Sequence, residues 1–274
     1  MSSDTQNHPF HMVDPSPWPA LGGLAGLTLA VGAVFFFHDE PLFGINGIFK
    51  LVPGFVLLIL TMILWWIDVV KESVYQNVHS EEVSFGLRMG MVLFIASEVM
   101  FFFAFFWAFF WGSLGASPTT TQWPPEGIEV IDAWHLPFYN TVILLTSGAT
   151  VSRAHLYIEA GKNKAAADWI WATVALGVLF LGIQVYEYGH APFGLTDGLY
   201  PSTFYLATGF HGFHVFVGTT FLIVCGFRAS KQQFKASKHI GFQSAAWYWH
   251  FVDVVWLFLF VWVYWLLGEP VRTF

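Results

Sequence analysis

Glu98 is the residue of this sequence best placed for proton chemistry. It stands in a long apolar stretch, and Arg88, ten residues earlier, is the only cation nearby on the same segment. In a helix that spacing is about 15 Å along the axis, too far for an ion pair. Glu98 is therefore either protonated, since burial disfavours the charged form, or paired with a group on another helix. One interpretation is a protonatable site, and the other is a neutral carboxyl hydrogen-bonded between helices.

Three histidines and a second carboxyl form another candidate group. His211 and His214 share one face of a helix, and His250 precedes Asp253 by one turn on another helix. Such residues can ligate haem or a metal ion. Spacing of three residues is common by chance, however, and neither a cysteine nor an HExxH pattern accompanies it. Hydrogen bonds that hold the sixth helix to the seventh are the favoured interpretation, and Glu187, late in the fifth helix, is expected at the membrane interface.

The segments that must position these side chains are long and apolar. Of 274 residues, 56% are hydrophobic and only 11% are charged, against roughly 25% charged in soluble domains. A bilayer core needs about 20 apolar residues in a helix. Barrel strands would alternate in polarity, whereas residues 101–110 are apolar throughout. Seven stretches are long enough for a helical span: Trp18–Phe37, Ile45–Val70, Val83–Trp111, Trp134–Ile158, Ala167–His190, Tyr200–Phe227 and Gly241–Leu267.

We therefore expect an all-α integral membrane protein with a single transmembrane domain, residues 18–274. A polar, proline-containing arm, residues 1–17, precedes it. Small residues at Gly22, Gly26 and Ala30 predict a close helix–helix contact on the first span.

The orientation follows from the positions of lysine and arginine, which favour the cytoplasmic or matrix side of a membrane. Lys50 and Arg272 fall on one side of the seven spans. The other nine lie on the side of the N-terminus: Lys71, Arg88, Arg153, Lys162, Lys164, Arg228, Lys231, Lys235 and Lys238. The N-terminus is thus expected on the cytoplasmic or matrix side and the C-terminus opposite. No Gly-rich phosphate loop, Ser/His/Asp elbow or nucleic-acid signature is present.

Several long strings resemble subunit III of cytochrome c oxidase. They are HPFHMVDPSPWP at 8–19, GMVLFIASEVMFF at 90–102, WPPEGI at 123–128, FYLATGFHGFHV at 204–215 and AWYWHFVDVVWLFLF at 246–260. Their order and length make the resemblance specific, and it runs from about His8 to the end of the seventh span.

The resemblance implies a non-catalytic core subunit of an aa3-type haem-copper oxidase, which reduces oxygen to water and pumps protons. Haem a, haem a3, CuA and CuB would belong to the partner subunits I and II, and this chain would carry no metal. The family fold has two bundles, helices one and two against helices three to seven, which form a V-shaped cleft filled with phospholipids. The attributed roles are lipid binding, protection of subunit I from inactivation during turnover, and support of proton uptake.

By position, the resemblance also assigns residues. Glu98 matches a buried carboxyl that reacts with carbodiimide in the family. His8, His11 and Asp14 of the arm are expected to collect protons, because histidine titrates near neutral pH. Residues that match the lipid cleft are Trp66, Lys71, Glu72, His79, Phe94 and Arg228. Ile67 departs from relatives that have arginine there, which puts the headgroup contacts at that point in doubt.

Two alternatives remain beside this interpretation. One is a haem- or metal-binding membrane oxidoreductase that uses His211, His214 and His250. The other is a proton-conducting channel centred on Glu98. The host membrane is expected to be the bacterial cytoplasmic membrane or the mitochondrial inner membrane.

Overall fold

The computed structural model describes residues 14–76, 78–115 and 122–266. This part of the chain contains seven long α-helices and no strand, which confirms the all-α prediction. The helices are α1 (Trp18–Phe37), α2 (Val52–Lys71), α3 (Glu81–Ser113), α4 (Leu136–Glu159), α5 (Asn163–His190), α6 (Leu199–Ser230) and α7 (Ile240–Leu259). Short helical turns precede α2 (Gly47–Lys50), follow it (Glu72–Gln76) and extend α7 (Phe260–Leu266).

The helix boundaries agree with the predicted spans to within a few residues, except at the start of α2 and at the end of α7, where the helical turn Phe260–Leu266 completes the predicted span. Proline stands in the first turn of α1, α2 and α4, where the missing N–H has no helical partner to lose. Pro53 therefore begins α2 later than the predicted Ile45. At the end of α4, Gly161 has φ +72° and its N–H donates to Ile158. Glycine adopts this left-handed conformation without steric cost and ends the helix.

Six of the described helices, together with their short extensions, have the length and hydropathy of a membrane span. The seventh, α4, is more polar but has 24 residues, which is about 36 Å of helix. Its hydroxyls, including those of Thr141, Thr146 and Ser152, donate to carbonyls one turn earlier in the same helix. Hydroxyls satisfied in this way do not need water, so α4 can stand among the apolar helices.

The chain divides into two compact units, residues 1–86 and 87–274. The grouping agrees with the predicted separation of helices one and two from helices three to seven, with the boundary falling inside α3. The phospholipid-filled cleft between two bundles stays a prediction.

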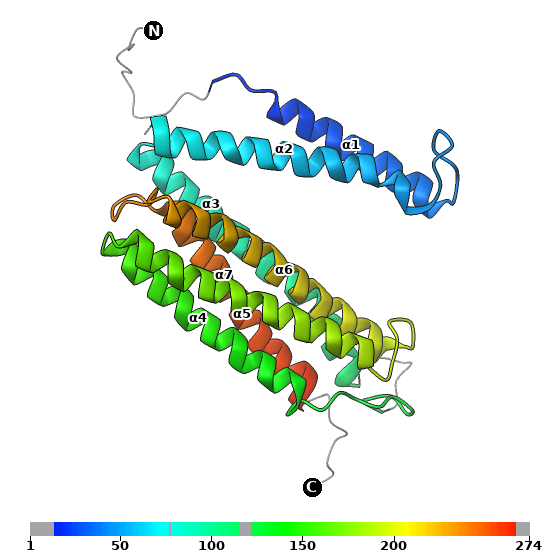
Figure 1. The fold of residues 1–274 in the computed structure, drawn as a ribbon. Helices are drawn as coiled ribbons and strands as arrows, with labels where there is room; N and C mark the ends of the chain where they lie inside the picture. The colour runs from blue at the N-terminus through cyan, green and yellow to red at the C-terminus, as the bar shows by residue number, and fades with distance from the viewer. Residues whose placement is uncertain (1–13, 77, 116–121, 267–274) are drawn as a thin grey trace. The chain divides into compact units, whose positions relative to one another are not determined.

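In the first unit, α1 and α2 pack as an antiparallel pair (Figure 1). The contact depends on Gly54, where a Cβ atom would lie 2.6 Å from the Cα of Leu29, and on Gly32, which faces the carbonyl of Lys50. Of the predicted ridge of Gly22, Gly26 and Ala30, Gly22 faces α2, where a Cβ would lie 3.9 Å from Thr61, whereas a Cβ on Gly26 would meet no atom within 4 Å among the described residues. Small residues do form the close contact between α1 and α2, as expected, but the closest contacts are at Gly32 and Gly54 and not at Gly26.

Lys50 is 2% exposed in this unit, and its Nζ donates to the carbonyl of Phe35 at 3.1 Å. Phe35 is in the last turn of α1, where carbonyls lack helical partners and the helix dipole favours a cation. The ammonium group therefore caps α1 and joins it to the turn before α2.

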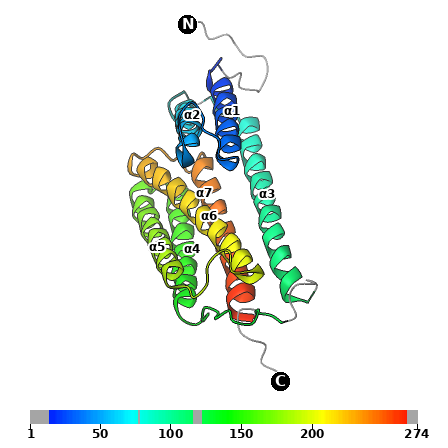
Figure 2. The ribbon, with the colours of Figure 1, turned by 90° about the vertical axis from the view of Figure 1, so that its right-hand side faces the viewer.

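In the second unit, α4, α5, α6 and α7 pack side by side (Figures 1 and 2). Trp249 is fully buried at their centre, and a Cβ on Gly177 or Gly218 would lie within 2.9 Å of its ring. The α3 helix contacts this group through large aromatic side chains, such as Phe102 against Phe251 and Phe106 against Phe258. The core is therefore a packing of aromatic rings into slots left by glycine.

Candidate functional site

Glu98 and His214 form a direct pair between α3 and α6. Glu98 Oε2 lies 2.9 Å from His214 Nε2, and the Ser97 hydroxyl approaches the other carboxyl oxygen at 3.4 Å. The side chains of Glu98 and His214 are 20% and 7% exposed. Glu98 therefore has a partner on another helix, and both sequence interpretations, a protonatable site and a neutral interhelical hydrogen bond, include this contact.

The second nitrogen of His214 determines how many protons this pair holds. Nδ1 lies 2.6 Å from the carbonyl of Phe210, and a carbonyl only accepts, so Nδ1 carries a hydrogen. The Nε2 to Oε2 contact then holds one proton, on the carboxyl as Glu–COOH with neutral imidazole or on the ring as an ion pair. Both arrangements are neutral overall, which suits a site surrounded by aromatic rings.

Those rings enclose the pair on several sides. The His214 ring lies 4.9 Å from Phe102, and it stands 6.2 Å from both Tyr248 and Phe251. A low-dielectric enclosure strengthens a satisfied hydrogen bond and penalises an unsatisfied one. With its one shared proton, the pair therefore leaves no net charge in the bundle.

His250 bridges α7 to α4 through a second polar group. Its Nε2 lies 3.1 Å from the Ser152 hydroxyl, and its Nδ1 lies 3.5 Å from Asp253 Oδ2. The Ser152 hydroxyl donates to the carbonyl of Gly148 at 2.9 Å, so it accepts from the imidazole. A nucleophilic serine needs the opposite polarity, with its proton given to the histidine. Gly148 also leaves the room for Asp253, whose carboxyl would meet any Cβ at that position.

His211 differs from the other two histidines. It is fully buried, and neither ring nitrogen has a hydrogen-bond partner among the described residues. Its ring packs 5.1 Å from Trp256 and 5.6 Å from Phe180. The hydrogen bond predicted for His211 is absent from this part of the chain, and aromatic packing holds the ring instead.

The helices joined by these histidines also differ from the prediction. The sequence favoured a lock between the sixth and seventh helices. His214 joins α6 to α3, and His250 joins α7 to α4. A face shared by two side chains is a local property, whereas the helix opposite that face depends on the packing of the whole unit.

A buried carboxyl that the sequence reasoning missed lies on α5. Glu187, expected at the interface, is 3% exposed. Its Oε1 accepts from Tyr264 at 2.7 Å and from Gln184 at 2.9 Å. Gln184 also accepts from Asn140 at 3.4 Å. Asn140 and Gln184 lie inside two predicted spans, and polar amides at such positions could have indicated a buried hydrogen-bond network.

The residues assigned to lipid contact in the first unit stand at the end of α2 and in the turn after it. Trp66 is 58% exposed. Lys71 pairs with Asp68 at 2.9 Å, and the same carboxyl accepts from the Trp18 indole at 2.8 Å. Glu72 and His79 approach to 3.8 Å. An exposed indole beside alternating charges is a common composition for the membrane interface.

The two assigned residues of the second unit are held by aromatic rings. Phe94 is half exposed and stacks on Tyr248 at 6.2 Å. The Arg228 guanidinium lies 4.6 Å above the Phe234 ring, a cation–π geometry. Of the assigned proton-collecting residues, Asp14 is exposed, while His8 and His11 lie outside the described residues.

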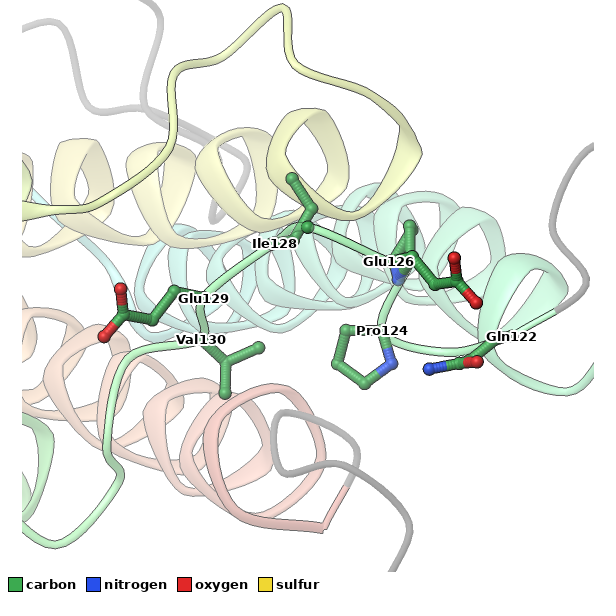
Figure 3. Close-up of a pocket in the computed structure, with 8 residues that line it drawn as sticks. Gln122, Pro124, Glu126, Ile128, Glu129 and Val130 are labelled. Atoms are coloured by element: carbon green, nitrogen blue, oxygen red, sulfur yellow. The ribbon is translucent and has the colours of Figure 1, made fainter.

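A shallow cavity of about 310 Å³ lies in the connection between α3 and α4 (Figure 3). Residues of this one loop line it, among them Pro124, Glu126 and Glu129. No histidine or cysteine is among the lining residues, so the cavity offers none of the ligands expected of a haem site.

The fold and these contacts define a class of protein: a helical membrane protein whose second unit encloses paired ionisable groups. A family model for cytochrome c oxidase subunit III matches residues 8–267. The chain is 53% identical to cytochrome c oxidase subunit 3 of Arabidopsis thaliana, over 97% of this chain and 99% of that protein. The chain is 53% identical to the corresponding protein of Marchantia polymorpha, over 97% of this chain and 100% of that protein. It is 51% identical to that of Branchiostoma lanceolatum, over 95% of this chain and 97% of that protein.

The chain therefore belongs to the cytochrome c oxidase subunit III family. It is a membrane subunit of an oxidoreductase complex that contains further subunits.

Proposed function

We propose that this chain is the non-catalytic subunit III of an aa3-type oxidase. In this proposal haem a, haem a3, CuA and CuB are held by subunits I and II, which reduce oxygen to water and pump protons. This chain binds phospholipids, stabilises subunit I against inactivation during turnover and supports proton uptake.

The arrangement of the candidate histidines is the observation that supports a non-catalytic role. Both nitrogens of His214 are engaged, by Glu98 and by Phe210. His250 contacts Ser152 and Asp253, and His211 is enclosed by aromatic rings. An axial haem ligand needs a free lone pair aimed at open space for the macrocycle. These three side chains do not fit that requirement, so in this proposal they take no part in electron transfer.

The lipid-binding role rests on the apolar exterior and the assigned residues. Large apolar side chains on α1 and α2, such as Leu27, Met62 and Trp66, are more than half exposed. A surface of this kind needs acyl chains or a protein partner against it. We place the N-terminus on the cytoplasmic or matrix side of a bacterial or mitochondrial membrane, from the distribution of lysine and arginine.

Removal of the chain from the complex tests these roles together. The oxidase is purified through a tag on this chain, and detergent then separates the chain from the rest. We expect the reduced-minus-oxidised haem spectrum to stay wholly with the remaining subunits, lipid phosphorus to leave with the chain, and the remainder to lose activity after fewer turnovers. Haem leaving with this chain would show that its histidines are ligands, and an undiminished number of turnovers would contradict the stabilising role.

The N-terminal arm is proposed to supply protons to subunit I. Its carboxyl Asp14 is exposed, and a surface group that exchanges protons with water can feed an adjacent uptake path. We expect His11→Ala with Asp14→Ala to slow proton uptake at alkaline pH, where protons are scarce, and to leave it nearly unchanged at acidic pH. Unchanged uptake at alkaline pH would remove the arm from the proposal.

A further inference from the structure

Three side chains that the oxidase role does not use converge at one end of the second unit. His155 and Glu159 are one turn apart on α4, and His239 directly precedes α7. The end of α4 and the α6–α7 connection lie at the same end of the unit (Figures 1 and 2). One ligand atom of each residue lies within 4.8 Å of the other two. We propose that this cluster is a binding site for a zinc ion.

The distances are close to those around a tetrahedral zinc ion. The two Nε2 atoms of His155 and His239 are 3.1 Å apart, and His155 Nε2 lies 3.8 Å from Glu159 Oε1. Two ligands about 2.0–2.1 Å from a tetrahedral zinc ion are about 3.3 Å from each other. Shifts of a few tenths of an ångström in the imidazole pair, and a rotamer adjustment of the exposed Glu159, would complete three ligands.

The hydrogen bonding of His239 prepares its nitrogen for a metal. Its Nδ1 lies 3.2 Å from the carbonyl of Lys235, so Nδ1 carries the hydrogen and Nε2 presents a lone pair in the neutral ring. A backbone carbonyl on the far nitrogen is the usual way that proteins fix the tautomer of a zinc-binding histidine. In the metal-free pair, His155 Nε2–H donates to this lone pair. When zinc binds, it takes the place of that hydrogen, and His155 changes to the tautomer that carries its hydrogen on Nδ1.

The connection that carries His239 is braced on both sides. Asn163, at the start of α5, donates to the carbonyl of Phe234 at 2.8 Å. Lys235 and Lys238 exchange two backbone hydrogen bonds, 3.3 and 3.0 Å long. The buried Phe234 ring packs 6.0 Å from Phe242. His239 is therefore positioned before any ion binds, which lowers the entropic cost of binding.

The ligand types select the kind of ion. Two imidazoles and one carboxylate suit zinc, whereas magnesium and calcium prefer oxygen ligands. Glu159 is 53% exposed, so an ion has access from solvent, and water can take the fourth position. The carboxylate also offsets part of the ion's charge next to Lys235 and Lys238.

Chemical footprinting on the intact oxidase tests the proposal at residue level. The chelator-treated complex is modified with diethyl pyrocarbonate, with and without zinc sulfate, and labelled histidines are quantified by mass spectrometry. We expect zinc to slow modification of His155 and His239 about tenfold or more, and magnesium sulfate to have no effect. The exposed His38 and His190 serve as internal controls and should react equally under all conditions.

A variant separates a zinc site from a simple histidine pair. Glu159→Gln keeps the volume of the side chain but removes its charge, and we expect it to raise the zinc concentration for half-maximal protection at least tenfold. Glu129→Gln, in the loop between α3 and α4, is the matched control and should leave it unchanged. Equal protection in Glu159→Gln, or none in the unaltered complex, would overturn the proposal.

The metal content gives a second readout if His155 reacts slowly for steric reasons. After equilibrium dialysis against micromolar zinc, the His239→Asn complex should hold one zinc equivalent less than the unaltered complex by elemental analysis. His190→Asn should hold the same amount as the unaltered complex. Equal zinc contents in His239→Asn and the unaltered complex would contradict the site.

Discussion

Glu98→Leu is expected to destabilise the chain by about 3–5 kcal/mol, the usual cost of removing one partner from a buried pair. The change leaves His214 Nε2 without a partner among Phe102, Tyr248 and Phe251. His214→Leu should cost a similar amount, because the Glu98 carboxyl then retains only the long contact to Ser97. Equilibrium unfolding of the full chain in mixed micelles, followed by far-ultraviolet circular dichroism, measures both variants.

The double variant decides whether the two side chains act as a pair. With leucine at both positions, no orphaned polar group remains, so the combined loss should be smaller than the sum of the single losses by about 1–3 kcal/mol. Additive losses would mean that the 2.9 Å contact contributes no coupling.

Glu98→Gln should be much milder, because the amide N–H can donate to His214 Nε2. The same variant tests the channel alternative. Proton flux through the reconstituted chain, if present and abolished by Glu98→Gln, would support conduction centred on Glu98. If the chain is a supporting subunit, we expect no such proton flux.

Trp249→Ala is expected to cost about 3–5 kcal/mol in the same assay. The ring is fully buried in the slot left by Gly177 and Gly218, and its indole donates to Ser147 at 2.8 Å. Helices in lipid gain little from the hydrophobic effect when they associate, so contacts between closely packed atoms supply much of their stability. Removal of this ring leaves a cavity that α5, α6 and α7 cannot close without moving.

Trp107→Ala is the matched control, because this indole is 64% exposed on α3. It should change the free energy of unfolding by well under 1 kcal/mol in a detergent environment. If Trp249→Ala were as mild as Trp107→Ala, the bundle would be able to repack around Trp249, and its central role would be wrong.

The sequence by itself determined the class of protein and the number of helices. Membrane spans are recognisable locally, because about 20 apolar residues in succession have few other uses. The boundaries of α1 were predicted to the residue, and Pro53 displaced only the start of α2. The family could also be inferred from the sequence, since long strings such as residues 90–102 and 204–215 carry it.

The tertiary structure alone decided which polar groups meet. His214 pairs with Glu98 across 116 residues, and His155 meets His239 across 84. The sequence contained the one-turn spacing of His155 and Glu159 but gave no indication of the third residue, on another helix. The sequence also suggested Gly26 of α1 as a close helix contact, whereas α1 and α2 approach each other at Gly54 of α2, against Leu29 of α1.

These misses have one physical cause. A helix in water shows its inner face by an apolar stripe, whereas a helix in lipid is apolar on the side toward protein and on the side toward acyl chains. The residue pattern therefore states that α3, α5 or α6 crosses the membrane but not which side faces a neighbour. Only the packing of glycine against Trp249, and of Phe102 against His214, fixed those faces and brought the ionisable groups together.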